Sequence, residues 1–61
     1  MKLIIQTNRD GYSTDQIYKT FTVRELINFL EDYDEDMPVY LSFDNGYAYG
    51  GLTAEHFKEK E

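Results

Sequence analysis

The sequence predicts a small α+β fold of the order ββαββ, in which a four-stranded antiparallel sheet carries one helix packed on one of its faces. Three observations predict it: segments of alternating apolar residues, one segment with helical spacing, and turn signals between them. Since the chain has 61 residues, its core is small. We expect one domain over residues 1–53 and a charged C-terminal tail over 54–61.

The first two strands are predicted at residues 2–7 and 16–21. The first segment is short, apolar and β-branched, and the second alternates between two faces, as half-buried strands do. Asp10 and Gly11 lie between them, and an Asp-Gly pair is typical of a turn. The two strands should therefore run antiparallel, joined by a loop longer than a tight hairpin.

The helix is predicted from Val23 to Tyr33. Thr22 and Glu25 have the spacing of a capping box, in which each side chain accepts a hydrogen bond from the other residue's backbone amide. Pro38 prevents any continuation of the helix. Apolar residues at helical spacing form one stripe: Val23, Leu26, Ile27 and Leu30.

The last two strands are predicted at residues 39–43 and 47–49, the second ending at a pair of glycines. Asn45 and Gly46 between them favour a type I′ turn, whose twist matches that of a hairpin. The tail, residues 54–61, is expected to form a frayed helical turn or to be disordered.

One helix covers only one face of such a sheet. If the apolar residues of the strands face the helix, then Ile4, Tyr18 and Tyr40 lie on the opposite face. Tyrosine tolerates water at its hydroxyl, so this tyrosine-bearing face can stay exposed. It can also pair with a second copy, which would enlarge a small core. The sequence leaves a homodimer open.

Composition restricts the class of ligand. The net charge is −6, with 12 acidic and 6 basic residues, so nucleic acid and anionic membranes are expected to be repelled as direct ligands. No cysteine is present, and no apolar run approaches the roughly 20 residues of a membrane span. No signal peptide is recognisable either. We expect a cytoplasmic location.

The negative charge is concentrated after the predicted helix. No lysine or arginine occurs between Glu25 and Ala54, and the helix C-terminus already disfavours negative charge. Two interpretations stay open: a solvated connection, or a carboxylate row that imitates nucleic-acid phosphates and enters a basic groove. The acids of the second interpretation are Glu31, Asp32, Asp34, Glu35, Asp36 and, at the hairpin turn, Asp44. The aromatic residues suited to anchor such a contact are Tyr33, Tyr47 and Tyr49.

Catalytic and metal-binding patterns are missing. Asp32, Asp34 and Asp36 have the spacing that opens a calcium loop, but the turn glycine and the closing glutamate of that loop are replaced by Met37 and Phe43. The single histidine, His56, has no nucleophile motif near it and is expected to be a solvated surface residue. We predict no catalytic residue, no metal site, no cofactor and no enzyme activity.

Residues 21–27 and 30–39 resemble a pattern common in small phage and prophage proteins. In that pattern a capped helix leads through an acidic turn with a Pro-Val step into a strand. Some small acidic proteins of this class inhibit host defence, including anti-CRISPR proteins that occupy the DNA-binding surface of an effector nuclease. The resemblance implies a non-catalytic inhibitor of a basic host protein, acting in the host cytoplasm. The alternative is a structural or regulatory homodimeric module that uses the tyrosine-bearing face.

Overall fold

The computed structural model describes all residues, 1–61. The chain forms two compact units. The first unit contains residues 1–7 and 38–61, and the second contains residues 8–37. We describe each unit by itself. Their regular elements are, in chain order, β1 (Leu3–Gln6), the 3₁₀ turn η1 (Thr14–Gln16), α1 (Val23–Leu30), β2 (Val39–Phe43), the 3₁₀ turn η2 (Asp44–Gly46), β3 (Ala48–Gly51) and the 3₁₀ turn η3 (Ala54–His56).

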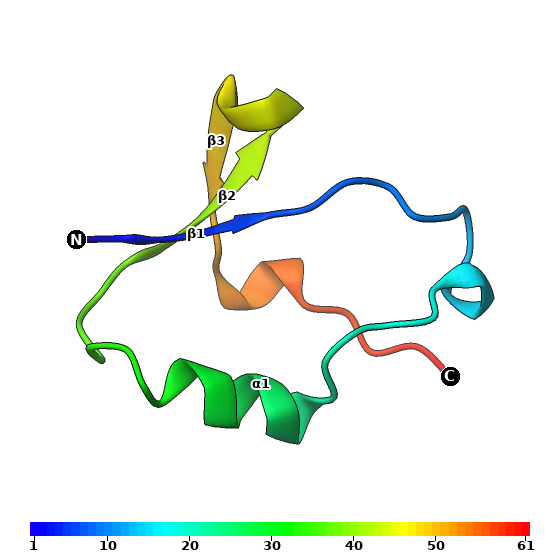
Figure 1. Ribbon diagram of the computed structural model, residues 1–61, viewed down its shortest axis with the longest axis horizontal. Helices are drawn as coiled ribbons and strands as arrows, with labels where there is room; N and C mark the ends of the chain where they lie inside the picture. Colours follow the sequence, from blue (N-terminus) through cyan, green and yellow to red (C-terminus); the bar gives the residue numbers. More distant parts are fainter. The chain divides into compact units, whose positions relative to one another are not determined.

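The first unit is built on a three-stranded mixed sheet of order β1-β2-β3 (Figure 1). Strand β1 pairs parallel to β2, with Leu3 opposite Val39, and β2 pairs antiparallel to β3, with Leu41 opposite Gly50. The predicted four-stranded antiparallel sheet is therefore wrong, although the chain is a small α+β fold. A parallel pair requires a long crossover between its strands, and residues 7–38 supply it. Packing of the helix on one face of the sheet stays a prediction.

The strand predicted at residues 16–21 does not form. Residues 14–16 form η1, in which the Ile17 amide donates to the carbonyl oxygen of Thr14 at 3.1 Å. The Tyr12 amide donates to Oε1 of Gln16 at 2.6 Å. Residues 17–21 follow without a strand partner, and Tyr18 is fully exposed. Alternating side chains permit a strand, but only a ladder of hydrogen bonds makes one, and β1 forms its ladder with β2.

The start of α1 is confirmed. The Glu25 amide donates to Oγ1 of Thr22 at 3.1 Å, and the Thr22 amide donates to Oε1 of Glu25 at 2.9 Å. The helix ends at Leu30, earlier than the predicted Tyr33, and Glu31 is its C-cap. The Tyr33 amide donates instead to the carbonyl oxygen of Leu30 at 3.1 Å. The acids crowded at the negative end of the helix dipole oppose a further helical turn.

The hairpin between β2 and β3 is confirmed, but its turn is longer than predicted. Asp44, Asn45 and Gly46 all have positive φ, at 52°, 58° and 90°. The Tyr47 amide donates to the carbonyl oxygen of Phe43 at 3.1 Å, so a loop of residues 44–47 replaces the two-residue type I′ turn. Tyr47 is consequently part of the loop, and β3 begins at Ala48. Asparagine and aspartate tolerate the left-handed region better than other residues with side chains.

The register assigns the strand side chains to two faces. One face is apolar and carries Leu3, Ile5, Val39, Leu41, Phe43 and Ala48, as the alternation predicts. The other face carries Ile4, Gln6, Tyr40, Ser42 and Tyr49, and this set is the tyrosine face below. Tyr18 is not part of it, because its predicted strand is absent. Ser42 is the one buried residue, at 7% exposure, and no apolar side chain is buried.

Candidate functional site

The acidic turn, residues 31–36, is organised by its own backbone. The Asp36 amide donates to Oδ1 of Asp34 at 2.9 Å, which is the hydrogen bond of an Asx turn. The Met37 amide donates to the carbonyl oxygen of Asp34 at 3.0 Å, and the Glu31 amide donates to that of Ile27 at 3.1 Å. These bonds connect the end of α1 to a defined turn. The five acids are therefore presented on a short hydrogen-bonded segment.

All five carboxylates of the acidic turn are exposed: Glu31, Asp32, Asp34, Glu35 and Asp36. None of them lies within ion-pair distance of a basic side chain, since the chain's one contact of that kind is between Glu55 and His56. The C-terminal end of α1 contributes further negative potential to the same place. The acidic turn is thus a strongly negative surface whose charge no side chain of this protein neutralises.

Tyr33 has a partner within its own unit. Its ring centroid lies 5.5 Å from that of Phe29, and Phe29 lies 5.5 Å from Phe21. The three rings form a row along α1 with tilted planes, the geometry that aromatic pairs favour. Tyr33 keeps 38% of its surface exposed. Its ring therefore contacts Phe29 and stays partly exposed, within the acidic turn of the sequence.

The other predicted site residues belong to the first unit. Asp44 and Tyr47 lie in the hairpin loop, where Tyr47 is 89% exposed, and Tyr49 lies in β3 with 61% exposed. Tyr49 belongs to the tyrosine face, whereas Tyr47 precedes the strand. That Asp44 extends the acidic turn into one surface stays a prediction.

A pocket on the tyrosine face was not predicted from the sequence. It is lined by Lys2, Ile4, Tyr40 and Tyr49 and has a volume of about 190 Å³. Lys2 and Ile4 come from β1 and the residue before it, and the tyrosines come from β2 and β3. Period-two spacing already places Lys2 with Ile4 on one face. The sequence does not reveal that β1 lies beside β2, so it does not reveal the pocket.

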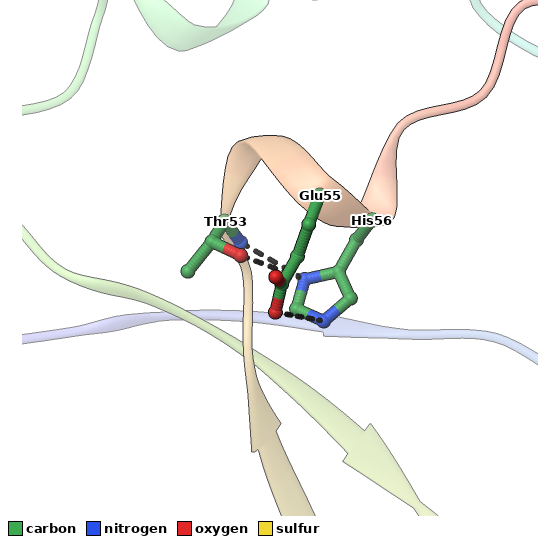
Figure 2. Close-up of polar contacts among 3 residues, drawn as sticks. All are labelled: Thr53, Glu55 and His56. Carbon is green, nitrogen blue, oxygen red and sulfur yellow. Dashed lines mark hydrogen bonds and ion pairs between the residues drawn. The ribbon is translucent and has the colours of Figure 1, made fainter.

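His56 has a structural role in η3. The Thr53 amide donates to Nδ1 of His56 at 3.0 Å, and Oγ1 of Thr53 lies 3.4 Å from the same nitrogen. Figure 2 shows the ring turned back toward Thr53, with Nε2 of His56 3.9 Å from Oε1 of Glu55. The tail thus forms one 3₁₀ turn, closed by its histidine. The sequence led us to expect a solvated surface residue. In the structure, His56 also accepts a hydrogen bond within the turn.

No group of three or more histidine, cysteine, aspartate or glutamate side chains is arranged to hold a metal ion. Within the acidic turn, Oδ1 of Asp34 is already used by the Asp36 amide. No helix is long and apolar enough to cross a bilayer. Comparison with protein families, curated proteins and solved structures finds no match to this chain.

Proposed function

We propose that this protein is a non-catalytic binding module that inserts its acidic turn into a basic groove of a nucleic-acid-binding protein and inhibits it. The observation that carries the proposal is the acidic turn itself: five exposed carboxylates, none in an ion pair, on a segment held by the hydrogen bond from Asp36 to Asp34. Duplex phosphates recur about every 1.7 Å along the axis, so a groove built for them presents closely spaced Lys and Arg. A dense row of carboxylates is complementary to such a groove.

The electrostatic part of this contact acts chiefly on encounter. Complementary charge raises association rates, and the effect is screened beyond a Debye length of about 8 Å at physiological ionic strength. Affinity requires desolvated anchors, and aromatic side chains are the commonest ones. Tyr33, at the acidic turn, supplies a partly exposed ring for this purpose. Tyr47 and Tyr49 join it if the hairpin contacts the same partner.

The test begins with capture of partners from a bacterial lysate on the immobilised protein, washed at low and at high salt. A nucleic-acid-binding protein retained at low salt and released at high salt is the expected result. Its binding to labelled DNA or RNA is then measured with and without this protein. Competition between the nucleic acid and this protein supports the proposal. Recovery of nothing basic, or only of further copies of this chain, contradicts it.

A charge-matched pair of variants separates the acidic turn from net charge. The first variant is Asp34→Asn, Glu35→Gln and Asp36→Asn, in which the amide that replaces the Asp34 carboxylate keeps an oxygen to accept the backbone N–H two residues on. The control is Asp10→Asn, Asp15→Asn and Glu59→Gln, which removes the same three charges elsewhere. We expect inhibition to be lost in the first variant and kept in the control. An equal loss in both would assign the effect to overall charge.

A further inference from the structure

The pocket on the tyrosine face combines an apolar wall with one cation. Ile4 supplies the aliphatic surface, Tyr40 and Tyr49 supply two aromatic rings, and Lys2 supplies the only charge among the lining residues. The exposed fractions of Ile4, Tyr40 and Tyr49 are 37%, 38% and 61%, so the pocket opens to solvent without any rearrangement. All four residues belong to one compact unit.

The size of the pocket suits a single ring. Its volume is about 190 Å³, whereas an apolar cavity of about 150 Å³ accommodates benzene. A ring with one small substituent therefore fits. Gly51 adds room on the same face: it lies opposite Tyr40 in the register, and a Cβ at this position would meet no atom within 4 Å.

The charge of the pocket selects an anion. Lys2 makes no ion pair, although acids outnumber bases by 12 to 6 in the chain. An ammonium group beside aromatic and aliphatic surface attracts a ligand that has both a ring and a negative group, and it repels an aromatic cation. The ring would lie against Ile4 and the tyrosines, with its anionic group toward Lys2.

A second observation on this face concerns Ser42. Ser42 is buried, with 7% of its surface exposed, and its Oγ has no hydrogen-bond partner. Ser42 lies directly opposite Tyr49, one of the residues that line the pocket. Buried hydroxyls are nearly always hydrogen-bonded, so an unpartnered one requires an explanation. This hydroxyl leaves a polar group unsatisfied on the tyrosine face, although Ser42 itself does not line the pocket.

We propose that the pocket formed by Lys2, Ile4, Tyr40 and Tyr49 binds a small aromatic carboxylate, one aryl ring carrying one carboxylate group. This binding site shares no residue with the acidic turn and is independent of the function proposed for it. It gives the protein a ligand site with the opposite charge preference to that of the acidic turn.

The experiment is a titration of the full-length, ¹⁵N-labelled protein with sodium benzoate at constant ionic strength, followed by amide chemical shifts. We expect saturable shifts centred on Ile4, Tyr40, Tyr49 and Gly51. Benzamide, which has the ring without the charge, should bind about two- to fivefold more weakly, the range expected for one exposed charge pair. Shifts that do not saturate, or that are spread over the whole chain, would overturn the proposal.

Lys2→Gln and Lys19→Gln form a matched pair, because each removes one positive charge and Lys19 lies outside the pocket. Lys2→Gln should lower benzoate affinity to that of benzamide, and Lys19→Gln should leave it unchanged. Gly51→Leu places a side chain on the same face and should weaken both ligands at least tenfold. Equal effects of the two lysine variants would refute the role of Lys2. Shifts at these residues that follow protein concentration rather than benzoate would assign the face to a second copy of the chain instead.

Discussion

The ring of Phe43 lies against Gly50 on the neighbouring strand: a Cβ at Gly50 would come within 3.2 Å of Cε2 of Phe43. Because Gly50 has no side chain, the ring of Phe43 on β2 can lie across β3, the second strand of the hairpin. Gly51, the next residue, faces open space and has no comparable neighbour. The two adjacent glycines are therefore expected to respond differently to the same substitution.

Gly51→Ala should raise the free energy of unfolding by about 0.4–1 kcal/mol, because alanine restricts the unfolded chain and meets no obstacle in the folded one. Gly50→Ala should raise the free energy of unfolding by less, since the Phe43 ring must move by a few tenths of an ångström to admit the methyl group. Urea denaturation of both variants measures the difference. If the two gains are equal, the contact between Phe43 and Gly50 is without energetic consequence.

Thr22→Ala should lower the free energy of unfolding by about 1 kcal/mol, because it removes the acceptor for the Glu25 amide at the start of α1. Denaturation followed by circular dichroism measures this loss of stability. Thr20→Ala is the control, since Thr20 precedes the cap and makes no hydrogen bond. A loss of equal size in the control would show that the capping box does not stabilise the helix.

Asp36→Lys should raise the free energy of unfolding by about 0.3–0.5 kcal/mol, or the melting temperature by about 1–4 °C. The Asp36 side chain accepts no hydrogen bond and makes no ion pair, while its backbone amide, which any residue retains, holds the turn. The substitution thus removes repulsion without removing a contact. The gain should shrink as salt is added, because salt screens the repulsion.

Glu59→Lys is the matched control for Asp36→Lys, since it makes the same change in net charge. Glu59 lies between Lys58 and Lys60, so reversing its charge creates repulsion there. Calorimetry of the two variants should show a higher melting temperature for Asp36→Lys alone. A drop in melting temperature for Asp36→Lys would indicate that the carboxylate has a stabilising partner.

The neutral ring of His56 should carry its proton on Nε2, because Nδ1 accepts the hydrogen bond from the Thr53 amide. Long-range ¹H–¹⁵N correlation spectra at alkaline pH distinguish the two tautomers directly. A predominantly Nδ1-protonated ring would contradict the closure of η3 by its histidine. His56→Ala provides the companion measurement, in which the Thr53 amide should exchange with solvent faster than in the wild-type protein.

Some features of this protein were predicted from the sequence because they depend on residues close together in the chain. The capping box spans four residues, and its two hydrogen bonds need nothing beyond Thr22 and Glu25. The alternation in residues 39–43 and the following turn residues likewise predicted β2 and the reversal after it. The exposed position of the five acids also followed from their sequence, since closely spaced carboxylates remain in water.

The predicted strand at 16–21 failed for a reason that lies outside that segment. Its alternation is compatible with a strand, but η1 takes up the first residue, and the remaining residues form no ladder of hydrogen bonds with any strand of the sheet. The hairpin turn differed on a smaller scale. Asn45 and Gly46 were correctly placed in the reversal, but the positive φ of Asp44 extends it by two residues and excludes Tyr47 from β3.

The sequence by itself determined the start of the helix, the acidic turn and the alternation of apolar and polar side chains along the β2 strand. These features arise from hydrogen bonds, dihedral preferences and solvation within a few residues. Only the tertiary structure decided that β1 pairs parallel with β2, and with that pairing came the tyrosine face and the pocket beside Lys2. Strand pairing joins residues more than thirty positions apart, from Leu3 to Val39, and its direction depends on the crossover between them rather than on either strand.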